Sequence, residues 1–233
     1  MLAISVISLW LASLIILLSI NISQLPWFLL ILAVLLRAFL HTGLFITTHD
    51  AIHGTVFPQH RQFNDFIGSV AARMYVFLPY KILLEKHQLH HQYPASAKDP
   101  DFCEDGSKNP FLWYLSFMKG YLEGKQSWVV FICMSLVFYP LLLGLHIPLV
   151  NLILFWLLPI FLSSIQLFCF GIFLPHRQPK NGYTNRHRAK SSNFSVFWSF
   201  LSCYHFGYHW EHHEYPHLPW YKLPSVVKDS ASI

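Results

Sequence analysis

Four long runs of apolar residues stand out in the 233-residue chain. They cover about residues 3–20, 26–48, 127–145 and 148–174, and Arg37 is the only Lys, Arg, Asp or Glu within them. A helix that crosses a bilayer needs about 20 mainly apolar residues. Only residues 21–25 and 146–147 separate the two runs within each pair. The sequence therefore predicts an all-α integral membrane protein with four transmembrane helices in two hairpins.

The basic residues indicate how these helices are oriented. Eight of the sixteen Lys and Arg residues fall between residues 54 and 126 and seven follow Leu174, whereas the two short turns carry none. The positive-inside rule places the basic segments in the cytoplasm. We therefore expect one membrane domain over residues 1–233, with cytoplasmic termini and a cytoplasmic helical cap made of residues 54–126 and 175–233.

Composition, the first apolar run and net charge argue against a soluble domain, a cleaved signal peptide and a nucleic-acid-binding protein. Charged residues make up 12% of the chain, about half the share typical of soluble domains. The first apolar run has no basic segment before it and is longer than the core of a signal peptide, so we expect a retained helix. The net charge of +5 fits the predicted topology and contact with anionic lipid, and it gives no reason to expect a nucleic-acid partner.

Histidines recur at fixed spacings near the cytoplasmic ends of the predicted helices. They form three boxes, HDAIH (residues 49–53), HQLHH (residues 87–91) and HWEHH (residues 209–213). Side chains at i, i+3 and i+4 share a helix face, so each box is expected to project its imidazoles in one direction. When matches to the template H-x-x-H-H are counted, chance gives roughly 0.06 for this composition, and the chain contains two.

The boxes predict a site for two metal ions. Imidazole is the commonest metal ligand near neutral pH. A tetrahedral zinc site uses at most four protein ligands, and the boxes supply eight histidines: His49, His53, His87, His90, His91, His209, His212 and His213. Their spacing suits a nitrogen-rich site with two ions but leaves iron, copper, zinc and nickel open.

The stretch HEYPH (residues 213–217) also matches the zinc-protease pattern H-E-x-x-H. That pattern needs both histidines on one continuous helix, and Pro216 between them would break such a helix. Proline also restricts the preceding residue, Tyr215, to extended conformations. We therefore expect the helix to end near Glu214, with His217 outside the metal site.

Residues 66–84 form a further apolar segment, which is interrupted by Arg73, Pro79 and Lys81. A fifth transmembrane helix here would place the second and third boxes on the opposite side of the membrane from the first. A single metal site forbids that arrangement, so we expect this segment to be interfacial or partly re-entrant.

Longer phrases around the boxes resemble a known family. These phrases are LHTGLFITTHDAIHG (residues 40–54), HQLHHQYPASAKDPDF (residues 87–102), FGIFLPHR (residues 170–177) and YHFGYHWEHHEYPHLPWYKLP (residues 204–224). They resemble the β-carotene ketolases, within the membrane fatty acid desaturase and hydroxylase superfamily. The resemblance runs from the second apolar run to Pro224.

This resemblance implies an O₂-dependent oxidation of the C4 methylene of carotenoid β-ionone rings to a ketone, from β-carotene through echinenone to canthaxanthin. It also implies two Fe²⁺ ions held by the eight box histidines and by His176, which follows the fourth apolar run. The carotenoid would be taken from the lipid bilayer. Electrons would come from an external donor, because the chain contains no flavin, haem or cytochrome b5-like motif. The fifteen Lys and Arg residues of the predicted cap favour a ferredoxin-type donor that docks there.

Other polar residues beside the boxes are candidates for supporting roles. His205, four residues before His209 and on the same predicted helix face, is a candidate additional ligand or hydrogen-bond partner. A ligating histidine usually donates its second ring N–H to an acceptor, and the candidate acceptors are Asp50, Asp99, Asp101 and Glu211. His41, eight residues before His49, is expected in the core or along a substrate channel.

Two alternatives remain open from the sequence. Carotenoid ring hydroxylation or fatty acyl desaturation would use the same boxes within the same superfamily. A histidine-rich metal transporter would instead bury its ligands along a path through several spans. Because the boxes lie at helix ends and only His41 lies deep in an apolar run, the sequence favours an enzyme.

Overall fold

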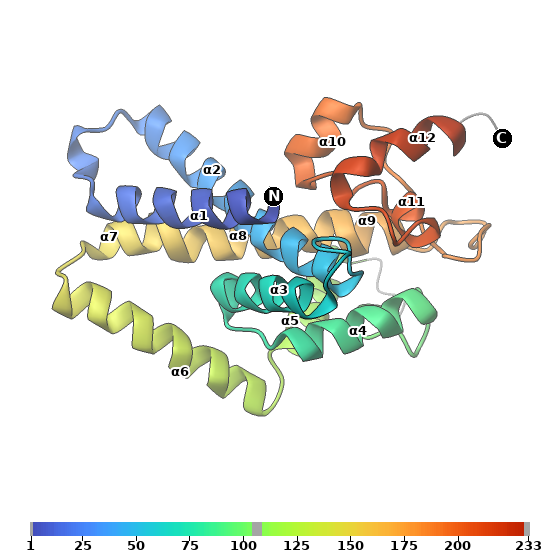
Figure 1. Ribbon diagram of the computed structural model, residues 1–233, viewed down its shortest axis with the longest axis horizontal. Coiled ribbons are helices and arrows are strands. Elements are labelled where there is room, and N and C mark those ends of the chain that lie inside the picture. The colour runs from blue at the N-terminus through green and yellow to red at the C-terminus, as the bar shows by residue number, and fades with distance from the viewer. Residues whose placement is uncertain (1, 104–108, 231–233) are drawn as a thin grey trace.

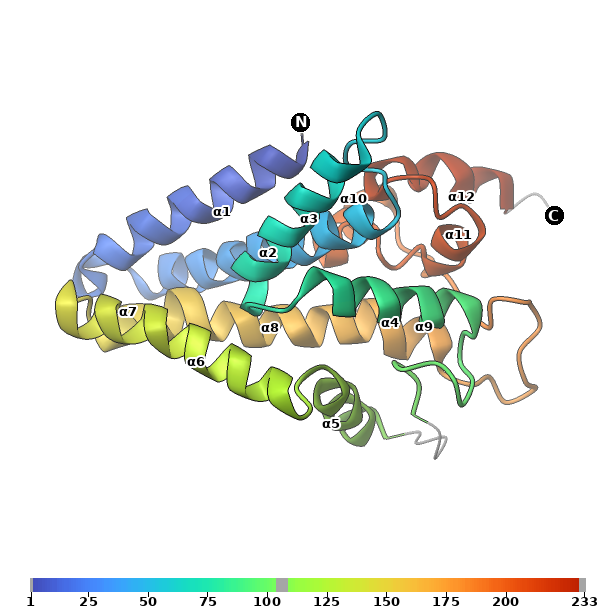
Figure 2. The same ribbon diagram turned by 60° about the horizontal axis from the view of Figure 1, so that its bottom comes forward.

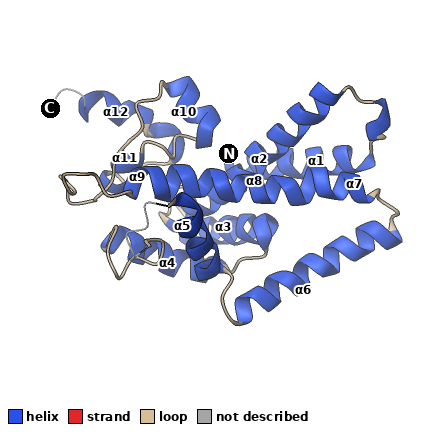
Figure 3. Cartoon of the chain, turned by 180° about the vertical axis from the view of Figure 1, so that it is seen from behind, coloured by secondary structure: helices blue, strands red, loops and turns tan. Residues whose placement is uncertain are grey.

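All regular secondary structure is helical and no strand occurs in residues 2–103 and 109–230, which are the residues that the computed structural model describes (Figures 1 and 3). The α-helices are α1 (Leu2–Ser19), α2 (Trp27–Ile52), α3 (Arg61–Val76), α4 (Tyr80–Gln92), α5 (Pro110–Tyr121), α6 (Lys125–Tyr139), α7 (Leu149–Leu152), α8 (Leu158–Leu167), α9 (Leu174–His176), α10 (Val196–Cys203), α11 (His209–Glu214) and α12 (Pro224–Ser230). Short 3₁₀ turns, η1 (Ile22–Gln24) and η5 (Trp220–Lys222), and π-helical segments, η2 (Pro140–Gly144), η3 (Ile153–Leu157) and η4 (Phe168–Phe173), complete the fold.

Four helices are long and apolar enough to cross a membrane. They are α1, α2, the α6–η2 unit over Lys125–Gly144, and the composite helix from α7 to α9 over Leu149–His176. These bounds confirm the four predicted apolar helices to within a few residues. The second helix continues to Ile52, so its last turn carries the first histidine of the HDAIH box.

The composite helix is joined to α1 and α2 through the fully buried Arg37. The Arg37 Nε donates to the carbonyl oxygen of Phe155 at 2.9 Å, and its Nη1 donates to the carbonyl oxygen of Trp10 at 2.7 Å. Pro159 has no N–H and cannot make the α-helical hydrogen bond to the Phe155 carbonyl four residues earlier. Arg37 therefore supplies the donor that Pro159 lacks, which explains a charged residue inside an apolar run.

The helices α3 and α4 meet at an angle of 99°. Phe77 ends α3 in the left-handed conformation with φ of 56°, and Pro79 immediately precedes α4. Proline cannot continue the preceding helix, so the chain turns at this point. The predicted interruption near Pro79 is confirmed, and the interfacial position of this helix pair stays a prediction.

The histidine boxes and the end of the composite helix meet at one end of the molecule, where α2, α4, α9 and α11 come together (Figures 1 and 2). The segment before α11 packs closely against the composite helix through Phe206 and Gly171. A Cβ atom on Gly171 would lie 2.5 Å from the Phe206 ring, so only glycine permits this approach. Phe206 in turn contacts the ring of His49, with 4.8 Å between ring centroids.

Candidate metal centre

Nine histidines gather in two adjacent groups at this end of the molecule. One group contains His49, His53, His87, His91 and His212, and the other contains His90, His176, His209 and His213. Within each group, one nitrogen of every ring lies within 4.8 Å of the others. The structure thus brings together all nine residues predicted as ligands, and their binding of metal stays a prediction.

The four-histidine group is buried throughout. The Nε2 atom of His213 lies 3.2 Å from that of His90 and 3.1 Å from that of His209. The outer nitrogens of two rings have acceptors of their own. The His90 Nδ1 donates to Asp99 at 3.0 Å, and the His176 Nδ1 donates to the carbonyl oxygen of Arg188 at 3.0 Å. Such acceptors fix the tautomer of a ligating histidine and leave its Nε2 lone pair facing inward.

The five-histidine group is more open. The His212 Nε2 lies 3.1 Å from the His49 Nε2 and 2.9 Å from the His91 Nε2, and the Nε2 atoms of His53 and His87 are 2.8 Å apart. The rings of His53, His87 and His91 are only partly buried. A surface hollow exposes this group to the outside, and its lining residues are Ile52, His53, Gln88, His91, Gln92 and Pro216.

These short distances between Nε2 atoms are better explained by nitrogens that converge on sites for cations than by hydrogen bonds between the rings. A ring N–H donates to one acceptor, yet the Nε2 atoms of His212 and His213 each meet two other Nε2 atoms. Burial, followed by the charges of neighbouring imidazoles, holds the pKa of His209, His212 and His213 well below the ordinary value. These rings are therefore neutral near pH 7, the form that binds metal. A donor set of imidazoles without thiolates fits iron, copper, zinc or nickel.

Each H-x-x-H-H box serves both groups. His87 and His91 belong to the five-histidine group, whereas His90 belongs to the other. In the last box the division is reversed, because His209 and His213 belong to the four-histidine group and His212 does not. The prediction that each box projects all its imidazoles in one direction was too simple. Residues four apart stay together, and the middle histidine of each box joins the other group.

Asp99 is the predicted acceptor that contacts a box histidine most directly. It accepts hydrogen bonds from the His90 Nδ1 and from the backbone N–H groups of Ala95 and Asp101. Burial opposes the negative charge, but the charge of His90 and these hydrogen bonds together lower the pKa of Asp99 below its ordinary value. Asp99 is therefore an anionic acceptor that orients the His90 ring.

The other three carboxylates meet different partners. Asp50 accepts from the backbone N–H of Trp220 at 3.2 Å, and its second oxygen lies 3.5 Å from the His49 Nδ1. Asp101 accepts from the Tyr121 hydroxyl at 2.9 Å. Glu211 accepts from the Ser191 hydroxyl, which also binds the backbone N–H of Trp210. Direct support of a metal ligand by these three carboxylates stays a prediction.

His205 does not share a helix face with His209, so that expectation was wrong. The helix α10 ends at Cys203, and Tyr204 and His205 both adopt left-handed backbone conformations, with φ of 49° and 62°. The His205 ring stacks on Tyr208 with 5.6 Å between centroids and belongs to neither histidine group. The helix α11 ends at Glu214 as predicted, and His217 lies exposed beyond it.

His41 occupies the core, one of the two positions expected for it. Its Nδ1 accepts from the Trp10 Nε1 at 2.9 Å, and its ring packs on Tyr75 with 4.6 Å between centroids. Tyr75, in contrast, lines a cavity. His41 therefore lies one side chain behind the cavity wall.

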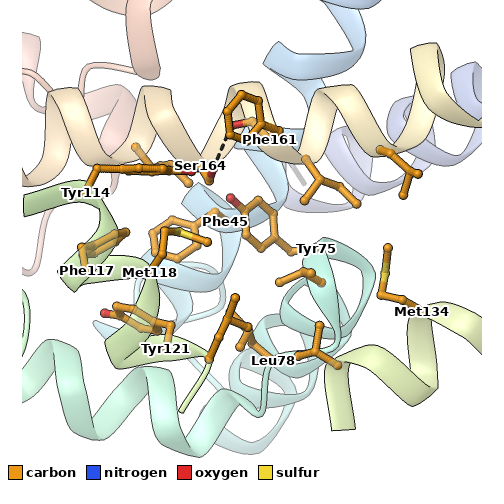
Figure 4. Close-up of a pocket in the computed structure, with 16 residues that line it drawn as sticks. Phe45, Tyr75, Leu78, Tyr114, Phe117, Met118, Tyr121, Met134, Phe161 and Ser164 are labelled. Carbon is orange, nitrogen blue, oxygen red and sulfur yellow. Dashed lines mark hydrogen bonds between the residues drawn. The ribbon is translucent and has the colours of Figure 1, made fainter. Parts of the chain in front are cut away.

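An apolar cavity of about 260 Å³ lies between α3, α5, α6 and α8 (Figure 4). A second, smaller cavity lies between the apolar cavity and the two histidine groups. Histidines of both groups line it, among them His49 and His90. Four residues line both cavities: Phe45, Phe117, Tyr121 and Leu167. The two cavities are thus neighbours along a path from the apolar helices to the metal centre.

Little in the sequence pattern indicates this path. Tyr121 and Phe117 belong to α5, a helix that the sequence marks only as apolar residues before the third predicted span. Their place at the metal centre depends on α5 folding back against the composite helix, and a contact of that kind has no local pattern. Asp101 was a candidate because of its position after the second box, but its partner Tyr121 was missed.

Comparison with known proteins confirms the resemblance carried by the histidine boxes. The family model for fatty acid desaturases matches residues 25–133 and 106–231. The chain is 40% identical to a zeaxanthin 4-ketolase of Chlamydomonas reinhardtii and to a β-carotene ketolase of Haematococcus lacustris, in each case over 80% of this chain. It is 39% identical to a β-carotene ketolase of Paracoccus sp. (strain PC1) over 85% of this chain.

The matches cover different shares of these relatives. They span 41% of the Chlamydomonas protein, 58% of the Haematococcus protein and 80% of the Paracoccus protein. No solved structure matches the chain. From the family model and the Paracoccus relative, the chain belongs to the fatty acid desaturase family and is a relative of its β-carotene ketolases.

Proposed function

We propose that this protein oxidises C4 of carotenoid β-ionone rings to a ketone, taking β-carotene through echinenone to canthaxanthin. The observation that carries the proposal is the small cavity lined by histidines of both groups, which adjoins a larger apolar cavity (Figure 4). The names of three relatives, two β-carotene ketolases and a zeaxanthin 4-ketolase, support the substrate class.

The net reaction balances as two oxygenations at one carbon. In the first, the CH₂ group, O₂, two electrons and two protons give CHOH and water. In the second, CHOH, O₂, two electrons and two protons give a geminal diol and water. The diol then loses water to leave the ketone. Four electrons per ring must therefore arrive from outside, because the chain carries no redox motif besides the histidines.

The nine histidines are the proposed ligands of two iron ions. Iron, when bound, supplies the O₂ activation that breaks a C–H bond, a chemistry that protein side chains alone do not provide. The residues around it have the remaining tasks. Asp99 and the Arg188 carbonyl hold the rings of His90 and His176 in place. Buried aromatic residues exclude water from the reacting end.

The apolar cavity is the proposed binding site for the ring and the adjoining polyene. Its walls are mostly Phe, Leu, Met and Tyr side chains, which bind a hydrocarbon by burying apolar surface. The helix α6 has no buried residue, and it diverges from the composite helix toward α5 (Figure 2). We infer that a carotenoid dissolved in the bilayer enters through this side.

Several apolar helices and membership in the desaturase family indicate a membrane protein. We propose that residues 1–233 form one multi-pass membrane domain with four transmembrane helices in two hairpins. The cap, residues 54–126 and 175–233, would face the cytoplasm together with both termini and the metal centre. The common location of all three boxes at one end of the molecule supports this topology.

The proposed electron donor is a soluble ferredoxin-type protein that docks on the cap. Fifteen of the sixteen Lys and Arg residues lie in the predicted cap, which favours an acidic partner. The hollow at His53 and His91 opens the five-histidine group toward that side. Full turnover by washed membranes given only ferrous iron and O₂ would argue against such a donor.

Pigment analysis of a β-carotene-producing host that expresses this chain tests the proposed function. We expect echinenone and canthaxanthin in the wild type, neither in His212→Ala, and normal amounts in the matched control His217→Ala, because His217 is exposed. A 3-hydroxylated carotenoid would identify a ring hydroxylase, and a new acyl double bond would identify a desaturase. Ketone formation unchanged in His212→Ala would refute the assignment of the third box.

A further inference from the structure

Tyr121 lies where the two cavities meet. It lines both of them, and in Figure 4 it stands beside Phe117 and Met118 on the wall formed by α5. Its hydroxyl donates to the Asp101 carboxylate at 2.9 Å, and Asp101 also lines the small cavity. A hydroxyl group and a carboxylate therefore lie together where the apolar cavity adjoins the cavity lined by histidines.

Both side chains of this pair are held firmly in position. The Asp101 N–H donates to Asp99, the same carboxylate that accepts from the His90 Nδ1. On the other side of the pair, the Lys86 ammonium group lies 4.8 Å from the centre of the Tyr121 ring and donates to the carbonyl oxygen of Gly120 at 2.8 Å. The position of the Tyr121 hydroxyl is thus tied by hydrogen bonds to a predicted metal ligand.

The proposed reaction creates a polar group at this point. After the first oxygenation, the ring carries a hydroxyl at the carbon that must react again. A hydroxyl without a hydrogen-bond partner in an apolar cavity is costly, so the alcohol would tend to move away from the histidines. Thr48 also lines the small cavity, but its hydroxyl donates to the carbonyl oxygen of Leu44 at 3.0 Å and can then only accept. The Tyr121–Asp101 pair adds a carboxylate, whose oxygens have acceptor sites beyond the one that Tyr121 uses, so Asp101 can accept from the new hydroxyl.

We propose that Tyr121 and Asp101 bind the hydroxyl of the ring alcohol and so hold C4 in place for the second oxygenation. The inference rests on the proposed ketolase function. In the step concerned, the remaining C–H bond at C4 is replaced by a C–OH bond. One oxygen atom of O₂ enters the diol, and the other leaves as water with two donor electrons and two protons. Loss of the pair would release the ring at the alcohol stage.

The test is the ratio of C4 alcohol to C4 ketone in a β-carotene-producing host. For Tyr121→Phe we expect this ratio to rise roughly 10-fold, the size of effect that a single hydrogen bond produces. The variants are compared at equal protein level, because a smaller amount of folded enzyme would also leave more alcohol unconverted. The iron content of the purified variant should equal that of the wild type, because Tyr121 is not among the histidine groups.

Tyr80→Phe is the matched control. The Tyr80 hydroxyl also donates to a carboxylate, that of Asp65, at 3.0 Å, but it lies away from both cavities. This variant should leave the alcohol-to-ketone ratio unchanged. Asp101→Asn is a second test variant that keeps the size of the side chain and removes its charge, and it should raise the ratio in the same direction.

The outcomes separate this inference from the proposed function. A wild type that makes ketone, with an unchanged ratio in both Tyr121→Phe and Asp101→Asn, overturns the inference and leaves the ketolase function intact. A wild type that makes no C4-oxygenated carotenoid overturns both. An equal rise in Tyr80→Phe would also overturn the inference, since the effect would then not depend on the cavity.

Discussion

The two histidine groups are built from the same boxes but lie in different surroundings. The four-histidine group is buried throughout, and its rings at His90 and His176 are held from behind by Asp99 and by the Arg188 carbonyl. The five-histidine group has three partly buried rings and opens to a surface hollow. One set of sequence motifs thus supplies two candidate metal sites that differ in access and in how firmly their histidines are held.

This difference suggests a division of tasks between two bound ions. Fixed, buried ligands favour tight binding because little motion is lost when the ion enters. In the proposed di-iron enzyme, the partly exposed histidines would leave one ion closer to the surface, where the proposed electron donor could approach.

Removing a ligand should do most damage in the buried group. We expect His176→Ala to lower ketone formation by more than about 100-fold, because even an outer partner of a ligand is worth roughly 10- to 100-fold. His53→Ala removes one of five rings from the open group and should cost less. Pigment yield per unit of protein measures both. An equal or larger loss in His53→Ala would contradict the proposed difference between the groups.

Removing the charge of Asp99, which accepts a hydrogen bond from His90, should have the next largest effect. Asp99→Asn keeps the shape of the side chain but removes the charge, and we expect ferrous-ion affinity to fall roughly 10- to 100-fold. Asp50→Asn is the matched variant, because the Asp50 carboxylate bonds the Trp220 backbone and lies 3.5 Å from the His49 Nδ1. Its effect should be smaller. If Asp99→Asn and Asp50→Asn lost the same ferrous-ion affinity, Asp99 would have no special role in orienting a metal ligand.

The smallest effect on metal binding is expected for His205. His205→Ala removes a buried ring that packs against Tyr208, so the free energy of unfolding should fall by about 1 kcal/mol. The iron content per chain should stay at the wild-type value. Thermal unfolding and metal analysis on the same sample check this. Loss of an ion in His205→Ala would show that His205 is a ligand after all.

The histidine spacing made much of this site predictable. Residues four apart on a helix share a face, so the pairs His87/His91 and His209/His213 stay together, as helix geometry requires. The helix α11 ends at Glu214, as expected from the missing N–H of Pro216. The four apolar helices were also predictable, because hydrophobic runs of that length have few other folded forms.

Other features depend on contacts that no local pattern records. The assignment of His90 and His212 to opposite groups requires α4 and α11 to face each other. His205 was misplaced because two left-handed residues interrupt the helix before α11, and non-glycine residues seldom adopt that conformation. The burial of Arg37 depends on its hydrogen bond to the Phe155 carbonyl, which Pro159 cannot pair with because it has no N–H.

Anaerobic titration of the purified, metal-free protein with ferrous ion would show whether the two histidine groups hold two ions. We expect binding of two ions per wild-type chain, one more tightly than the other, and selective loss of the tighter ion in His176→Ala. His217→Ala should behave as the wild type. Saturation of the wild type at one ion, or retention of the tighter ion in His176→Ala, would contradict the assignment of two metal sites to the two histidine groups.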